Sequence, residues 1–140
     1  KLYIRLTKSR ARHSNDNALV ESKNGSVIRK LYGRNYIPAI TAPRMNQFNR
    51  EYVNVYLNYH RPCGFAEQMV DARGKIKKKY SQWTTPYERL HSLANAERYL
   101  KPGITFAQLD RIAYAESDNQ FAERMRNAQV QLFTQLRSFI

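Results

Sequence analysis

A glutamate in the middle of a basic segment is the first residue of this chain whose chemistry needs an explanation. Glu21 lies in the run RHSNDNALVESKNG, residues 12–25, five positions after Asp16, which is a good helix cap. A carboxylate near the start of a helix usually interacts with the helix dipole, but that benefit fades within the first turn. Gly25 follows one turn later on the same face, where glycine costs about 1 kcal/mol relative to alanine. A substrate backbone passing close to Glu21 would explain the missing side chain.

Metal binding is the chemistry that this helix face favours. Asn17, Glu21, Gly25 and Ile28 share the face, which is therefore mostly small and polar rather than apolar. A divalent cation neutralises a carboxylate and a phosphodiester together, so such a face is typical of an acid that binds metal beside nucleic acid. A dipole partner or a surface residue is the ordinary interpretation of a single glutamate, and the residues themselves leave it open.

The charge of the chain predicts a polyanionic partner. It has 24 lysines and arginines against 11 aspartates and glutamates, a formal net charge of +13 that exceeds what solubility requires. Residues 1–80 carry 17 basic and 5 acidic side chains, whereas residues 81–140 carry 7 and 6. We therefore expect nucleic acid, rather than an anionic membrane, to contact the first 80 residues. No apolar run is long enough to span a membrane, and the single cysteine, Cys63, fits the reducing cytoplasm.

A strand followed by a helix is expected at the start of the chain. Alternating apolar residues predict a half-buried strand over residues 1–7, whose sheet neighbours we expect to lie outside this chain. The strand has no start methionine before it, and the chain is therefore expected to be a fragment. Good caps at Asn15 and Asp16 and a glycine at position 33 predict a helix over residues 16–32 that carries Glu21.

A second helix is expected from Pro43 to His60, with Thr41 as its cap and the pair Arg61-Pro62 after its end. Helical spacing places six apolar and aromatic residues on one face: Met45, Phe48, Tyr52, Val55, Tyr56 and Tyr59. The tyrosines have flat rings that could stack on bases, but their periodicity favours a core role.

Residues 66–83 predict a β-hairpin around the turn Asp71-Ala72-Arg73-Gly74. Five cations gather on and after this turn: Arg73, Lys75, Lys77, Lys78 and Lys79. Tyr80 and Trp83 follow them with flat aromatic surface. Lysines on a strand can protect an exposed sheet edge, but five cations so close together favour contact with a phosphate backbone.

The last part of the chain reads as helices with clean start signals. Thr85, Thr105 and Ser117 each begin a capping box, and Ile104 is placed to contact Leu109. The final helix carries an apolar stripe made of Phe121, Met125, Ala128, Leu132, Leu136 and Phe139. This stripe is a candidate contact surface for another protein or for a second copy of the chain, which would give a homo-oligomer.

A zinc site and a cysteine nucleophile are weaker alternatives. His60 and Cys63 have the spacing H-x-x-C, but the only other histidines, His13 and His91, form no second pair of ligands. A Cys63–His60 catalytic pair would need a third group to orient the histidine, and the sequence does not indicate one. We therefore expect Cys63 to be a buried or partly buried thiol.

Three segments resemble the DDE transposases and integrases of bacterial insertion sequences. SRARHSNDNALVESKNGSVIRKLYG is similar to the end of their catalytic core, where a strand leads into a helix bearing the final acidic residue, here Glu21. FNREYVNVYLNYHRP is similar to their following helix, whose closing motif matches Tyr59, Arg61 and Pro62. TTPYERLHSL resembles a downstream segment of one transposase subgroup. The resemblance covers roughly residues 3–93.

This resemblance implies a ribonuclease-H-like fold and phosphoryl transfer on DNA. In that family three carboxylates hold two divalent metals, Mg²⁺ or Mn²⁺, and Glu21 would be a catalytic residue and a metal ligand of the complete site. The two aspartates of the family precede this glutamate, and Asp16 is too close to be one of them. The resemblance therefore implies a C-terminal part of a transposase that is not expected to catalyse by itself.

We thus expect an α/β fold turning mostly α: the end of a ribonuclease-H-like core over residues 1–62, a basic hairpin over 63–83, and a helical region over 84–140. The expected DNA contacts are Asn17, Lys23, Asn24, Arg29, Lys30, Arg34, Arg73, Lys75, Lys77, Lys78 and Lys79. The expected function is DNA transposition or integration in the bacterial cytoplasm, at the nucleoid. The alternative is a non-enzymatic DNA- or RNA-binding module in which Glu21 is a surface residue.

Overall fold

The computed structural model describes residues 2–3, 10–13, 18–34 and 36–137. Its internal contacts divide the chain into two compact units: Ile4–Ala39, and Lys1–Tyr3 together with Ile40–Ile140. The helix expected over 43–60 thus groups with the hairpin and the C-terminal helices, and not with the segment that carries Glu21.

The smaller unit contains one continuous run of helix from residue 18 to residue 32. It consists of α1 (Ala18–Lys23), a π-helical turn η2 (Asn24–Ile28) and α2 (Arg29–Tyr32). The predicted helix is confirmed over these residues, although its middle is wider than an α-helix. Gly33, with a φ of +74°, ends it and donates its N–H to the carbonyl of Arg29 at 3.0 Å. The predicted caps Asn15 and Asp16 lie outside the described residues.

The second predicted helix is confirmed and ends at the predicted residue. A 3₁₀ turn, η3 (Ala39–Thr41), leads into α3 (Ala42–Phe48), η4 (Asn49–Val53) and η5 (Tyr56–His60), which run on without a break. The prediction that the Thr41 side chain caps this helix is wrong. Thr41 already has helical backbone angles and makes no capping hydrogen bond, because a capping side chain needs extended backbone at its own position.

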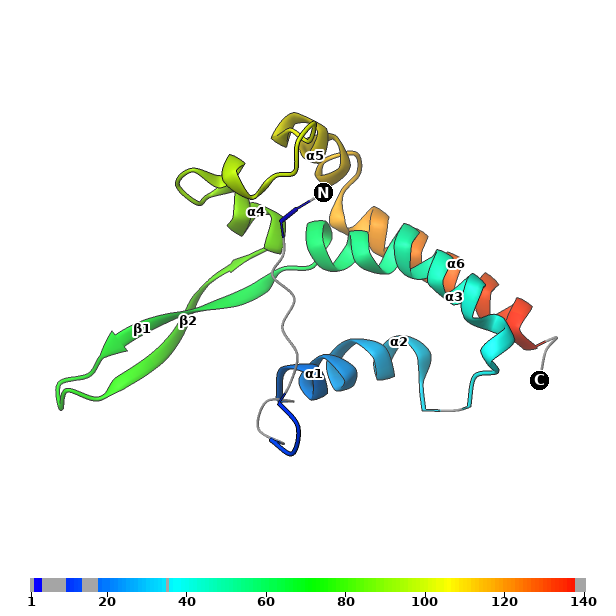
Figure 1. The fold of residues 1–140 in the computed structure, drawn as a ribbon, viewed down its shortest axis with the longest axis horizontal. Helices are drawn as coiled ribbons and strands as arrows, with labels where there is room; N and C mark the ends of the chain where they lie inside the picture. The colour runs from blue at the N-terminus through cyan, green and yellow to red at the C-terminus, as the bar shows by residue number, and fades with distance from the viewer. Residues whose placement is uncertain (1, 4–9, 14–17, 35, 138–140) are drawn as a thin grey trace. The chain divides into compact units, whose positions relative to one another are not determined.

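The long helix α6 (Asp118–Leu136) packs along α3, η4 and η5 (Figure 1). The predicted stripe is buried at four positions: Phe121, Met125, Leu132 and Leu136. Across the interface the ring of Phe121 lies 6.5 Å from the rings of both Tyr52 and Tyr56. The tyrosines of the second helix therefore have the predicted core role. The apolar face of α6 is therefore covered by the second helix of the same chain.

None of the described helices has the length and apolarity needed to span a bilayer.

Three capping boxes start the C-terminal helices as predicted. Thr85, Thr105 and Ser117 each accept a hydrogen bond from the backbone three residues later, at the starts of α4 (Pro86–His91), α5 (Phe106–Ala113) and α6. A short 3₁₀ turn, η6 (Ala96–Tyr99), lies between α4 and α5. Tyr87, Leu109 and Ala113 form a small core against which Ile104 packs.

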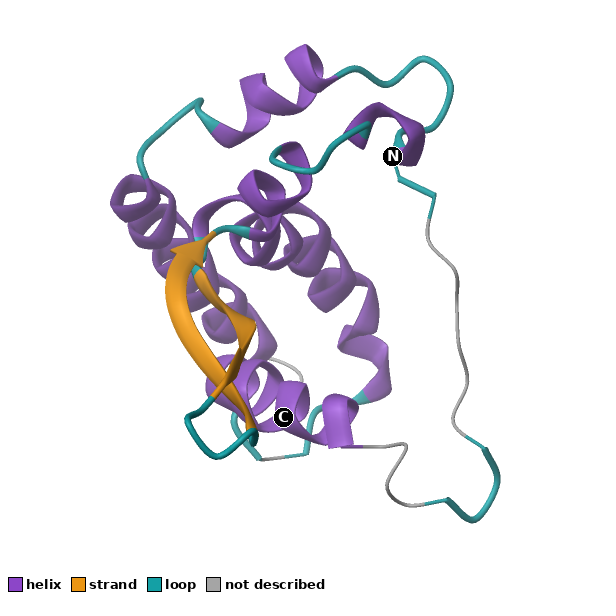
Figure 2. Cartoon of the chain, turned by 90° about the vertical axis from the view of Figure 1, so that its left-hand side faces the viewer, coloured by secondary structure: helices purple, strands orange, loops and turns teal. Residues whose placement is uncertain are grey.

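The predicted hairpin is confirmed, and its strands are longer than expected. β1 (Cys63–Val70) pairs antiparallel with β2 (Ile76–Thr84), and this ribbon is the only sheet within the described residues (Figure 2). The register shifts between Phe65 and Glu67, because β2 carries one extra residue there. Most of the ribbon is exposed on both faces, and it extends away from α4, α5 and α6 (Figure 1).

The predicted N-terminal strand can be followed at two residues only. Leu2 forms an antiparallel bridge with Leu100, and the N–H of Tyr3 donates to the carbonyl of Tyr99 at 2.9 Å. At these residues the neighbour belongs to the same chain. The rest of the predicted strand, residues 1 and 4–7, lies outside the described residues.

Replacement of His60 tests the helix packing of the larger unit. His60 is 2% exposed, stacks on Phe121 at 4.3 Å between ring centroids, and has Nδ1 3.0 Å from Asp118 Oδ1. We expect His60→Ala to lower the free energy of unfolding by about 2–4 kcal/mol, since it leaves a cavity in the core. We expect His60→Phe, which keeps a ring on Phe121, to lower it less. Urea unfolding followed by circular dichroism measures both, with the exposed Gln47→Ala as the control.

Candidate nucleic-acid interface

The tip of the hairpin is organised by one carboxylate. Asp71 Oδ1 accepts hydrogen bonds from the backbone N–H of Arg73 at 2.9 Å and of Lys75 at 3.0 Å. Gly74, with a φ of +74°, donates its N–H to the carbonyl of Asp71 at 2.9 Å. Asp71 Oδ2 lies 3.2 Å from Lys77 Nζ. These bonds hold the pKa of Asp71 below its ordinary value, chiefly through the Lys75 N–H, then through Lys77 and the Arg73 N–H.

The lysines of β2 do not form a single row. Lys77 pairs across the ribbon with Met69, Lys78 with Gln68, and Lys79 with Glu67. Because side chains alternate along a strand, Lys77 and Lys79 share one face and Lys78 lies on the other. The predicted cluster is therefore confirmed as a group of neighbours in space but is divided between the two faces.

The ribbon is nevertheless positive on balance. From Cys63 to Thr84 it carries five basic side chains and two acidic ones. Lys77 is tied to Asp71, while Arg73, Lys75, Lys78 and Lys79 are exposed at the turn and along β2. Such a ribbon can lie along a phosphate backbone with cations on both of its faces.

The residues predicted around Glu21 lie on a different compact unit from the hairpin. Glu21 is exposed on α1, and Lys23, Asn24 and Lys30 are exposed further along the same helical run. Arg29 and Arg34 line a shallow hollow together with Gly33. Asn17 lies outside the described residues. The structure thus brings Arg29 and Arg34 together at the end of this helix.

Packing within the chain does not explain the glycine beside Glu21. A Cβ atom built on Gly25 meets no described atom within 4 Å. Gly25 is partly buried, and Ile28, predicted on the same small and polar face, is 44% exposed. The π-helical turn η2 also widens the helix here, so the residues after Asn24 do not follow the α-helical spacing from which that face was predicted.

The described residues contain no group of three histidine, cysteine, aspartate or glutamate side chains that could hold a metal ion. Within these residues, Glu21 therefore has no set of partners that would complete the two-metal centre implied by the transposase resemblance. The weaker zinc alternative gains no support either, because His60 is paired with Asp118 and the Cys63 thiol points to the carbonyl of Arg61 at 3.6 Å. Cys63 is partly buried, as predicted.

Tyr59, Arg61 and Pro62, the three residues of the predicted structural motif, lie where the second helix ends and the hairpin begins. The ring of Tyr59 lies 5.1 Å from that of Tyr87, and burial raises the pKa of Tyr59. Arg61 is the first residue after the helix with extended backbone, and Pro62 follows it directly before β1. The motif therefore marks the passage from the second helix into the hairpin.

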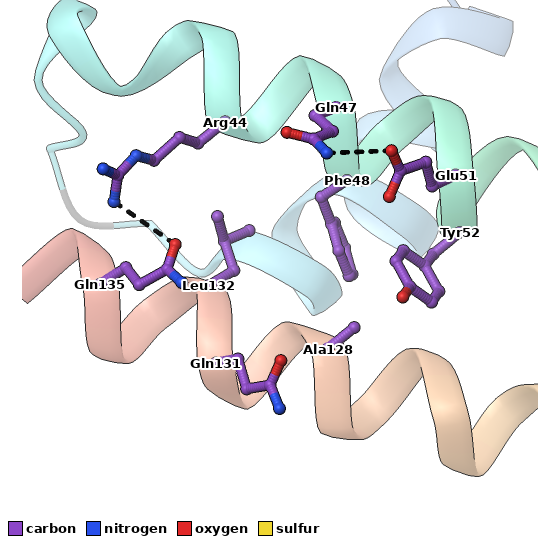
Figure 3. A pocket seen from close by; sticks show the side chains of 9 residues that line it. All are labelled: Arg44, Gln47, Phe48, Glu51, Tyr52, Ala128, Gln131, Leu132 and Gln135. Carbon is purple, nitrogen blue, oxygen red and sulfur yellow. Dashed lines mark hydrogen bonds between the residues drawn. The ribbon is translucent and has the colours of Figure 1, made fainter.

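A shallow groove runs between the second helix and α6 (Figure 3). Phe48, Tyr52 and Leu132 line it, and polar side chains line its edges. Arg44 donates to Gln135 across it at 3.3 Å, and Gln47 donates to Glu51 along one side at 3.0 Å. Four of the exposed side chains at its edges are thus bonded in pairs, and the groove is explained as the seam between two packed helices.

Sequence reasoning missed the contacts that join distant segments. Asp118, for which the sequence indicated no partner, is the partner of His60 across 58 positions. Arg124 pairs with Glu116 and lies over the rings of Phe121 and Tyr52 at 4.6 and 5.4 Å. The two amphipathic stripes were visible in the sequence, but the stripe of the final helix was predicted as a contact surface for another protein or a second copy, and no pattern indicated which polar residues meet.

Comparison with known proteins identifies no relative. No protein-family model matches the chain, and neither a curated protein nor a solved structure shows significant similarity to it.

The hydrogen bonds at the hairpin tip predict how Asp71 titrates. Its carboxyl group should titrate below its ordinary value of 3.8, so the ionised form stabilises the turn fully above that pH. This contribution should be lost only as the pH falls through the lowered pKa. Carboxyl carbon shifts in NMR measure the titration. Lys77→Met should raise the pKa only in part, because the larger contribution of the Lys75 N–H remains. A midpoint at or above 3.8 in the unmodified chain would contradict this geometry.

Proposed function

We propose that this chain binds duplex DNA through its β1–β2 hairpin and acts as part of a protein that carries out transposition or integration. The observation that carries the proposal is the hairpin itself, an exposed ribbon with five basic side chains against two acidic ones. A DNA ligand would place its action at the nucleoid of the bacterial cytoplasm.

The dimensions of the ribbon support contact with DNA. The rise along a strand is about 3.3 Å per residue, so Lys75 to Lys79 span roughly 13 Å, close to the width of the major groove. Lysines and arginines on both faces of a ribbon can contact phosphates on either side of a groove. Lysine ammonium groups read little sequence, so we propose weak sequence preference.

The dependence of binding on salt tests this role. Each phosphate contact contributes about 0.9 to the slope of log K against log salt concentration, because counterions are released from the DNA. Replacing Lys75, Lys77, Lys78 and Lys79 together with glutamine should reduce that slope by about 2–4 units. Fluorescence anisotropy of a labelled duplex at several salt concentrations measures it.

The control for this experiment changes the net charge by the same amount elsewhere. Lys101, Arg111, Arg126 and Arg137 are exposed in the C-terminal region. Replacing these four with glutamine should leave most of the slope, because the contacts are proposed on the hairpin and not on net charge. Equal loss of slope in both variants would remove the hairpin from the proposal.

The catalytic part of the proposal rests on Glu21. Glu21 is an exposed carboxylate in the middle of a helical run, and its neighbour Gly25 leaves open space that no described part of the chain needs. We propose that this open surface receives the DNA backbone and that Glu21 is the last of three carboxylates in a Mg²⁺ or Mn²⁺ site. The other two would have to come from outside the described residues.

Glu21→Gln separates this enzyme from a simple binding module. In a protein that supplies the other two carboxylates, we expect the variant to bind DNA normally and to lose strand transfer by at least about a hundredfold. Glu123→Gln, an exposed glutamate on α6, is the matched control and should keep full activity. In the alternative, a DNA- or RNA-binding module, Glu21→Gln would raise the affinity slightly and change nothing else. Strand transfer with near-normal rates would therefore favour the module.

A further inference from the structure

Two aromatic rings lie side by side on one face of the hairpin. A Cβ atom built on Gly64 would meet Tyr80 Cδ1 at 3.2 Å and Trp83 Cζ2 at 3.4 Å. Both rings therefore lie over the backbone of Gly64, which has no side chain to lift them away. Their outer surfaces remain free, since Tyr80 is 54% and Trp83 is 68% exposed.

The irregularity in β2 is what brings these rings together. Tyr80 and Trp83 are three residues apart, an odd interval, so regular alternation would place them on opposite faces of the ribbon. Lys79 pairs with Glu67 and Gln82 pairs with Phe65, which leaves two residues of β2 opposite one residue of β1. This β-bulge shifts the alternation by one position and returns Trp83 to the face of Tyr80.

The two faces of the ribbon have different surroundings. On one face, Arg89 from α4 lies over the ring of Phe65 at 5.7 Å. Tyr80 and Trp83 are on the opposite face, where Lys78 follows by the same alternation two residues from Tyr80. This face thus offers two flat rings followed by one exposed cation, in a ribbon that is positive on balance.

We propose that Tyr80 and Trp83 form a stacking platform for unpaired DNA bases, with Lys78 contacting the adjoining phosphate. The inference rests on the proposed function and deepens it, since it names unpaired DNA as a ligand of the same hairpin. In a duplex the faces of the bases are covered by their neighbours, whereas unpaired bases can stack on aromatic side chains with little sequence preference. The charge of the ribbon is complementary to a phosphate backbone and opposes pairing with a second copy of this chain.

Trp83 is the only tryptophan of the chain, so its fluorescence reports on this site directly. In titrations of the 140-residue chain, we expect oligothymidylate to quench the fluorescence, and a blunt duplex bound by the same protein to quench it far less. By anisotropy of labelled oligothymidylate, we expect Trp83→Ala and Tyr80→Ala each to weaken binding by about 5-fold to 100-fold. The affinity of these two variants for blunt duplex should change by less than about 2-fold, because the bases of a duplex do not stack on the rings.

Three further variants test the geometry. Trp83→Phe keeps a flat ring and should retain most of the affinity for oligothymidylate. Gly64→Ala keeps both rings but places a methyl group under them, so it should weaken binding while circular dichroism shows an intact fold. Tyr36→Ala removes an 83% exposed ring from the other unit and should have no effect.

The outcomes separate this inference from the proposed function. Duplex binding without quenching by oligothymidylate, and without loss in the two alanine variants, would overturn the platform and leave the proposed function standing. Quenching by oligothymidylate without duplex binding would support the platform and remove the duplex proposal. Stronger quenching by oligouridylate would overturn the assignment to DNA. A dimer in sedimentation that Trp83→Ala abolishes would show that a second copy occupies the face, and would also overturn it.

Discussion

The burial of His60 between Phe121 and Asp118 fixes where the hairpin begins. His60 is the last residue of the second helix, and its ring is held by the first turn of α6, 58 residues further along the chain. Arg61 then turns to extended backbone and β1 starts at Cys63. If this ring were not held, the end of the helix could fray, and the direction in which the ribbon leaves the helices would no longer be defined.

The end of the second strand is also held by hydrogen bonds and by packing. β2 ends at Thr84, and the next residue is the cap of α4, whose side chain and backbone exchange hydrogen bonds with Glu88. Tyr87, the second residue of α4, is 4% exposed and donates to Asp110 at 2.6 Å. Both strands of the ribbon thus arise from well-packed residues of one unit, while the tip, far from this support, is held by local bonds to Asp71. An isolated two-stranded ribbon is only marginally stable, and this anchoring supplies what the ribbon lacks.

Local features of the fold were predictable from the sequence, and contacts between distant segments were not. Capping boxes, the Asp71–Gly74 turn and the apolar stripe of α6 depend on residues within a few positions of one another, and the structure has them where they were predicted. The pairing of His60 with Asp118 depends on how two helices meet, which no local pattern specifies. Thr41 fails as a side-chain cap because the preceding turn already gives it helical angles.

The candidate site shows the same limit. Composition correctly predicted a basic hairpin, but not which residues of β1 lie opposite Lys77, Lys78 and Lys79, because this depends on the register of the pairing. Sequence reasoning also missed the proximity of Tyr80 and Trp83. The faces of a strand are predicted from regular alternation of side chains, and a β-bulge interrupts that alternation. For Glu21, the sequence predicted a position within a helix, and the structure confirms that position.

The bulge in β2 makes the relative placement of the two rings depend on the lengths of the two strands. Deleting Ser81, one of the two residues opposite Ala66, would restore regular pairing and keep Tyr80 and Trp83 on the same face, as their interval would become even. Inserting one residue into β1 between Phe65 and Glu67 would also restore regular pairing, yet it would send the two rings to opposite faces. The insertion in β1, which carries neither ring, would thus separate the two rings. The deletion of Ser81 in β2, which carries both, would not.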